Sequence, residues 1–119
     1  MFESGVKALN PQRFHILLAL ADEDRHGSAI VREVLEQSGG RIRLWPVMLY
    51  KSLDTLMESG LIVELKDPAS RPERASGRRR YFHLTDGGKQ VLSAEVERLV
   101  ALGDSARRKL AMTGERSGG

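Results

Sequence analysis

"PVMLYKSLDTLMESGLIVELK", residues 46–66, predicts a helix that is followed at once by a β-strand. Pro46 suits the first turn of a helix, because the amide that proline lacks would have no intrahelical partner there. Apolar residues repeat at steps of four and three, at Leu49, Leu53 and Leu56. This spacing marks a buried helical face and predicts a helix from Pro46 to about Ser59, which Gly60 ends.

Two strands are predicted on either side of a loop. After Gly60 the chain alternates, with Leu61, Val63 and Leu65 on one side and Ile62, Glu64 and Lys66 on the other. This alternation predicts a half-buried strand. A second strand, residues 81–84, places Phe82 and Leu84 on one face and Tyr81 and His83 on the other. We expect the two strands to pair as a hairpin.

The hairpin loop carries the excess positive charge of the chain. Residues 66–80 contain six basic and two acidic residues, a balance of +4, whereas the whole chain has a net charge of +3, so the remainder sums to −1. The loop arginines are Arg71, Arg74, Arg78, Arg79 and Arg80. A concentrated positive patch attracts phosphate, because screening removes the effect of diffuse charge beyond about 8–10 Å. The alternative is an ordinary charged surface loop.

Two further helices are predicted before residue 46. Asn10 and Pro11 suit the start of the first, and its apolar residues repeat at helical spacing to about residue 22. The second covers residues 28–37 and is stopped by the glycines that follow Ser38. Residues 41–45 alternate in polarity, which predicts a short strand.

A long last helix is predicted after Thr85, which suits the cap position. Its apolar stripe runs in steps of four and three through Leu92, Val96, Leu99, Gly103, Ala106 and Leu110. A helix of some 25 residues is about 38 Å long and extends beyond so small a domain. The first helix covers part of the stripe, and we expect a second copy of the chain to cover the rest in a homodimer. Gly103 is the position most able to break this helix.

Composition limits the class of protein. The 119 residues suffice for one domain, and the absence of cysteine excludes disulfides and thiolate sites. The longest apolar stretch, residues 16–21, is too short to span a membrane and no secretion signal is recognisable, so we expect a cytoplasmic protein. His15, His26 and His83 fall on separate elements, and no catalytic or phosphate-loop motif is present. We therefore expect no enzyme activity, no metal site and no cofactor.

Three helices followed by a hairpin are the arrangement of a winged helix-turn-helix, a mainly α fold with a small β-hairpin. In that fold the third helix enters the major groove of DNA, and the hairpin loop, or wing, lies against the backbone or the minor groove. We expect this domain to span residues 10–85 and the dimerisation helix to span residues 86–112. Residues 1–9 and 113–119 are expected to be flexible ends or short extensions.

The first turns of the third helix are the predicted reading surface. With the leucines inward, Val47, Lys51, Asp54 and Glu58 point outward, flanked by Met48 and Thr55. The acids lie in the C-terminal half and repel phosphate, so the helix should approach DNA by its N-terminus. Lys51 suits guanine, and Val47 or Met48 suits a thymine methyl group. The predicted DNA-binding residues are Pro46, Val47, Met48, Tyr50, Lys51, Thr55 and the five loop arginines.

Several of these residues have a structural alternative. Val47 and Met48 suit packing on a neighbouring helix as well as contact with DNA. Tyr50 suits either a phosphate contact or a structural role. Arg80 suits either a phosphate contact or a partner on the strand.

The residues just before the third helix raise a separate question. Trp45 either packs against the domain or lines a ligand cavity. No Ser, Thr, Asp or Asn precedes Pro46 as a cap, and we expect a DNA phosphate to meet part of the free amides.

Three segments resemble the PadR family of bacterial transcriptional regulators: His26-Gly27, "LYKSLDTLMESGLI" at residues 49–62, and "RRRYFHLTDGG" at residues 78–88. The resemblance covers roughly residues 14–100 and is to the short type with a single C-terminal dimerisation helix. It implies a homodimeric DNA-binding regulator of duplex DNA, usually a repressor, sometimes released by a small aromatic ligand. Ser28 and Val47-Met48 depart from the residues common in the family, and the second departure lies on the expected reading surface.

Two other functions stay open from the sequence. A winged helix also serves as a protein-interaction module, in which the basic loop would meet an acidic protein surface. The same fold also serves as a sensor of small aromatic ligands.

Overall fold

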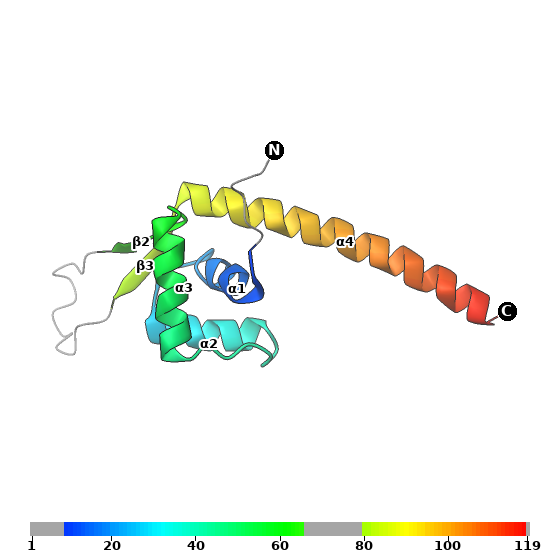
Figure 1. Ribbon diagram of the computed structural model, residues 1–119, viewed down its shortest axis with the longest axis horizontal. Coiled ribbons are helices and arrows are strands. Elements are labelled where there is room, and N and C mark those ends of the chain that lie inside the picture. Colours follow the sequence, from blue (N-terminus) through cyan, green and yellow to red (C-terminus); the bar gives the residue numbers. More distant parts are fainter. Residues whose placement is uncertain (1–8, 66–79, 119) are drawn as a thin grey trace.

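The computed structural model describes the backbone of residues 9–65 and 80–118, with side chains to residue 113. Figure 1 shows a group of helices and a small sheet, crossed by one long helix. The elements are α1 (Pro11–Ala19), β1 (Arg25–His26), α2 (Gly27–Gln37), α3 (Pro46–Glu58), β2 (Ile62–Leu65), β3 (Tyr81–Leu84) and α4 (Asp86–Gly118). The predicted order of three helices, a hairpin and a last helix is confirmed.

The first helix ends at Ala19 rather than near residue 22. Asn10 caps its start, as predicted, because its side chain accepts a hydrogen bond from the backbone amide of Arg13 at 2.8 Å. At the other end the Nε of Arg25 donates to the carbonyl of Ala19 at 2.8 Å. If the helix made another turn, this carbonyl would accept a hydrogen bond from a backbone amide. Arg25 occupies the carbonyl instead, and the helix ends there.

A strand that the sequence analysis did not predict completes the sheet. β1 pairs antiparallel with β3, and the strand order is β1-β3-β2. His26 ends β1 and caps α2, where its ring accepts from the Ala29 amide at 3.4 Å. The predicted hairpin is confirmed, since β2 and β3 are antiparallel neighbours with Ile62 opposite Leu84.

The prediction of a strand at residues 41–45 was wrong. Exposure does alternate there, since Leu44 is buried and its neighbours Arg43 and Trp45 are exposed. However, no strand in the described part of the chain pairs with this segment. The hydroxyl of Ser38 instead holds it, by accepting from the Ile42 amide at 2.9 Å.

The buried side of β2 is set by its pairing. Phe82 and Leu84 lie on the buried face of β3, as predicted. Ile62, opposite Leu84, is 1% exposed, whereas the neighbouring Val63 is 43% exposed. Of the two sides of the predicted half-buried strand, the side of Ile62 is therefore the buried one and the side of Val63 is not. Cross-strand partners share a face, so the register decides which residues enter the core.

The core lies between α1, α2, α3 and the sheet, and α4 covers one side of it. Its largest fully buried side chains include Ile16, Leu17, Ile30, Leu53, Leu56 and Phe82. None of the helices in the described ranges is long and apolar enough to cross a bilayer.

The last helix is longer than predicted. Thr85 caps it, since its hydroxyl accepts from the Gly88 amide at 3.0 Å and donates to the Gly60 carbonyl at 2.7 Å. α4 then runs for 33 residues, about 50 Å, and passes through Gly103 without a break. The helix therefore includes residues 113–118. In Figure 1 its C-terminal half projects beyond all other elements.

The fold should lose stability as the pH falls below 6.5. Burial lowers the pKa of His15 below its usual 6.5, and the Nε2 of Gln37 lies 3.0 Å from His15 Nδ1. The unfolded chain therefore binds this proton more readily. The contribution of neutral His15 to folding stability is therefore complete above pH 6.5. It declines as the pH falls toward the lower pKa that His15 has in the folded state. Urea unfolding of the wild type and His15→Gln on both sides of pH 6.5 tests this, because the variant should lose this part of the pH dependence. Equal pH dependence of the two proteins would contradict it.

Candidate nucleic-acid interface

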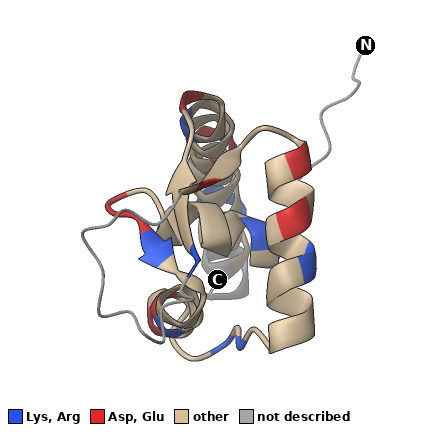
Figure 2. Ribbon diagram, turned by 90° about the vertical axis from the view of Figure 1, so that its left-hand side faces the viewer, with Lys and Arg blue, Asp and Glu red and all other residues tan. Residues whose placement is uncertain are grey.

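The outward face of α3 is the predicted one. Val47 is 81% exposed, and Lys51, Asp54 and Glu58 are exposed, while Leu49, Leu53 and Leu56 are buried. In Figure 2 the acidic positions of α3 lie toward its C-terminal end. The first two turns are therefore the part of this helix that an anionic surface can approach.

The start of α3 has no side-chain cap, as predicted. Trp45 occupies the cap position and makes no capping hydrogen bond. It is not packed into the domain, because it is 61% exposed, and the Arg43 guanidinium lies 5.6 Å from its ring centre. Trp45 instead stands at the rim of a cavity of about 300 Å³ that reaches Gly27 and Tyr50.

Two of the predicted contact residues are turned toward the protein. Met48 is partly buried against the core, and the side-chain amide of Gln12 in α1 donates to its Sδ at 3.4 Å. Thr55 is partly buried, and its hydroxyl donates to the Lys51 carbonyl at 3.1 Å. Met48 thus takes the packing role that was its alternative. Pro46, Val47, Tyr50 and Lys51 remain exposed at the start of the helix.

Tyr50 packs over the start of α2 while keeping 39% of its surface exposed. A Cβ atom on Gly27 would lie only 2.8 Å from the phenolic oxygen of Tyr50, so a larger residue at this position would displace the end of the tyrosine side chain. The two residues of the His26-Gly27 pair therefore act differently, since the histidine caps α2 and the glycine admits the tyrosine ring. This contact places Tyr50 at the edge of the predicted reading surface.

Arg80 connects the hairpin to α3. Its Nε and Nη2 donate to the Glu64 carboxylate at 2.9 Å each, and its guanidinium lies over the rings of Tyr50, at 5.6 Å, and Phe82, at 5.4 Å. The hydrogen bond to Glu64 raises the pKa of Arg80. An exposed pair of this kind contributes at most about 1 kcal/mol to stability, but it holds the guanidinium beside α3. The strand-partner alternative for Arg80 is thus realised, on the same side of the molecule as residues 46–51.

The other predicted wing arginines, Arg71, Arg74, Arg78 and Arg79, lie outside the described residues. The ends of the loop that carries them are Leu65 and Arg80, at the edge of the β2–β3 pair next to α3. Figure 1 shows both strands beside this helix.

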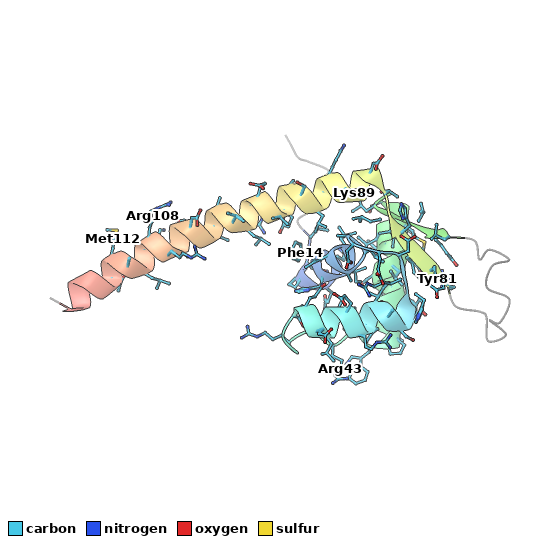
Figure 3. All side chains as sticks on the ribbon, turned by 180° about the vertical axis from the view of Figure 1, so that it is seen from behind. Phe14, Arg43, Tyr81, Lys89, Arg108 and Met112 are labelled. Carbon is cyan, nitrogen blue, oxygen red and sulfur yellow. The ribbon has the colours of Figure 1, made fainter. Side chains whose placement is uncertain are left out.

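The apolar stripe of α4 divides into a covered and an uncovered part. Leu92 is 7% exposed and packs in the chain's own core. Gly103 and Ala106 are exposed, as are Val96 (36%), Leu99 (39%) and Leu110 (70%). A groove of about 330 Å³ separates Phe14 of α1 from Val96, Leu99 and Val100. Figure 3 shows Phe14 between α1 and α4, whereas Arg108 and Met112 stand on the projecting part.

The sequence of this chain matches the model of one known protein family. The model of the transcriptional regulator PadR-like family matches residues 16–94. The chain belongs to this family. PadR-like proteins are transcriptional regulators, which agrees with the non-enzymatic class that the sequence predicted.

Solved structures share the fold of this PadR-like chain. A PadR family transcription regulator from Clostridium difficile superposes with a TM-score of 0.72 at 22% identity, over 85% of this chain and 99% of the other. A PadR-like transcription factor from Bacteroides fragilis gives a TM-score of 0.63 at 21% identity, over 81% and 86% of the two chains. The predicted winged-helix fold is confirmed.

A curated relative is also similar in sequence. It is an uncharacterized 37.1 kDa protein in transposon TN4556 of Streptomyces fradiae, 36% identical over 93 residues. The match takes in 78% of the PadR-like chain but only 24% of the relative. The chain thus spans about a quarter of that protein's length.

Three residues that contribute to these surfaces were not predicted from the sequence. Glu64 was assigned only to a strand, although it neutralises Arg80. Phe14 and Val100 were not connected with the uncovered part of α4, although both line its groove. In each case the partner lies far away in sequence, so no local pattern reveals the contact.

Proposed function

We propose that this chain is a sequence-specific, DNA-binding transcriptional regulator that acts as a homodimer and represses by occupying operator DNA. The observation that supports this most is the exposed, uncapped start of α3, which lies on the same side as Arg80 and the ends of the basic loop. This arrangement joins a helix that fits the major groove to a cationic wing.

The reading and positioning roles fall on different residues. Lys51 would donate to guanine, and Val47 would contact a thymine methyl group. Tyr50 would reach a phosphate with its hydroxyl, and the free amides at the start of α3 would meet another. The wing arginines would bind the backbone, which fixes the register but reads little sequence directly.

The uncovered part of α4 supports the homodimer. Exposed apolar residues continue along it from Val96 to Met112, and a projecting helix of this kind needs a cover. A second copy would provide it and would place two α3 helices about one DNA turn apart. By analogy with the family, we propose that a small aromatic effector releases the protein from DNA. Weakening of the DNA complex by such compounds would support this proposal.

The wing predicts a specific salt dependence. Each phosphate contact contributes about 0.9 to the slope of log affinity against log salt, so Arg78→Ala should lower the slope of the dimer by about one to two units. Arg80→Ala should lower it less, because Glu64 already neutralises that charge. Fluorescence anisotropy with random and upstream-promoter duplexes over a salt series measures both slope and preference. An unchanged slope for Arg78→Ala would assign the wing to solubility, and equal weak binding of both duplexes would favour a protein-interaction module.

Leu99→Glu should separate the dimer. Leu99 borders the groove beside α1, so an ionised carboxylate would lose its hydration at the interface. We expect dimer dissociation to become at least about 100-fold more favourable, from the roughly 3 kcal/mol that such burial costs. Light scattering at tens of micromolar protein should then find monomer, and the exposed Gln90→Glu should leave the dimer intact. A monomeric wild type, or a dimeric Leu99→Glu, would contradict the assigned interface.

A further inference from the structure

The loop between α2 and α3 carries a second cationic surface, separate from Arg80 of the hairpin. We define this loop patch as Arg41, Arg43 and Trp45, all of which are exposed. Within the described ranges, no carboxylate pairs with either guanidinium, and Arg43 stacks on Trp45. Figure 3 shows Arg43 pointing outward on the side of the molecule away from α4. The patch is therefore free to bind an anion.

The loop is anchored to the domain although it has no regular structure. Leu44, between Arg43 and Trp45, is 2% exposed and anchors the loop in the core. The Ile42 amide donates to the Ser38 hydroxyl at 2.9 Å, which fixes the turn before the patch. Because the backbone is already placed, binding through these side chains does not require the loop to become ordered.

The patch is continuous with the proposed reading surface. Trp45 immediately precedes Pro46, and the cavity of about 300 Å³ beside it extends to Tyr50. The guanidinium of Arg80 lies 5.6 Å from the ring centre of the same tyrosine. Arginine side chains from both the loop and the hairpin thus lie near the start of α3, and the one from the hairpin is paired with Glu64.

We propose that the loop patch is a second binding site for the DNA backbone, in addition to the wing. Arg41 and Arg43 each bind a phosphate, and the exposed indole of Trp45, beside Arg43, packs against the deoxyribose next to the phosphate that Arg43 binds. Alternating charged and apolar surface suits a sugar–phosphate chain better than it suits a small ligand, which would leave Arg41 beyond the cavity lining. This inference rests on the proposed DNA-binding function.

The chain provides an internal probe of the site, because Trp45 is its single tryptophan. In a titration of the full chain with a fluorescein-labelled duplex, anisotropy reports binding wherever it occurs on the protein. A parallel titration with unlabelled duplex follows Trp45 emission. We expect the emission to change with the same midpoint as the anisotropy.

A charge-matched pair of double variants separates contact from general attraction. Arg41→Ala/Arg43→Ala should lower the salt slope by about 1.8 units per subunit, the contribution of two phosphates. Lys89→Ala/Arg108→Ala removes the same charge from α4, away from Arg43 in Figure 3, and should leave the slope nearly unchanged. All four side chains are exposed, and thermal unfolding checks that each variant folds.

Each outcome decides the proposal. Anisotropy binding with unchanged Trp45 emission and equal slopes for both double variants would overturn the loop patch while leaving the DNA-binding function intact. A Trp45 response to benzoate, used as an aromatic anion probe, without a response to DNA would assign the cavity to a small ligand instead. Absence of any anisotropy change with all duplexes would overturn the proposed function, and the loop patch with it.

Discussion

Val47→Glu is expected to weaken DNA binding about 100-fold without weakening the fold. Val47 is 81% exposed at the second position of α3, so the substitution disturbs no packing. An acidic residue in the first turn of a helix favours the helix dipole, which should maintain or slightly raise stability. The same carboxylate would face the phosphates and the base edges, and it would remove an apolar contact that is itself worth on the order of 1 kcal/mol.

The measurement compares dissociation constants by anisotropy at one salt concentration, with thermal unfolding alongside. Gln90→Glu is the matched control, because it makes the same change of charge at an exposed site on α4. We expect its affinity to stay within about twofold of the wild type. If Val47→Glu bound as tightly as this control, the start of α3 would not be the reading surface.

Gly88→Ala is expected to destabilise the protein by about 3 kcal/mol, the upper part of the usual range for overpacking. A Cβ atom at this position would overlap the carbonyl oxygen of Leu61 and would lie 2.6 Å from Leu84 Cδ1. The first neighbour is backbone, so it cannot move without disturbing the turn between α3 and β2. Gly88 also donates its amide to the capping hydroxyl of Thr85.

The adjacent Gly87 provides the control for this substitution. A Cβ atom there would meet its nearest neighbour, the Gly60 carbonyl oxygen, at 3.6 Å, which is ordinary contact. Gly87→Ala should therefore be neutral or stabilise by up to about 1 kcal/mol, because alanine favours the helix. Urea unfolding of all three proteins at one concentration checks both expectations. Similar stabilities for the two variants would contradict the close approach of Gly88 in α4 to the carbonyl of Leu61.

The elements that depend on local pattern were predictable. The leucine spacing of α3, the cap at Asn10 and the cap at Thr85 each involve residues close together in the chain, and all are confirmed. Residues 41–45 show the limit of such patterns. These residues do alternate, but a strand also needs a neighbouring strand to pair with. In the sheet, β3 pairs with β1 on one edge and with β2 on the other, so neither edge of β3 is open to residues 41–45.

The candidate site was predictable to a similar degree. Periodicity placed Val47 and Lys51 outward, because a helix with three inward leucines leaves little freedom. It did not reveal that Met48 contacts Gln12, 36 residues away, or that Glu64 pairs with Arg80. The exposure of Trp45 was equally hidden, since a tryptophan beside a helix start usually suggests packing rather than a surface position.

Footprinting of fragments selected from genomic or random DNA tests the central claim most directly. A dimer that inserts the start of α3 into the major groove should protect two half-sites about 10 base pairs apart, related by twofold sequence symmetry. Val47→Glu should erase both protected regions together. Selection that enriches no common sequence, or protection without paired half-sites, would contradict the account.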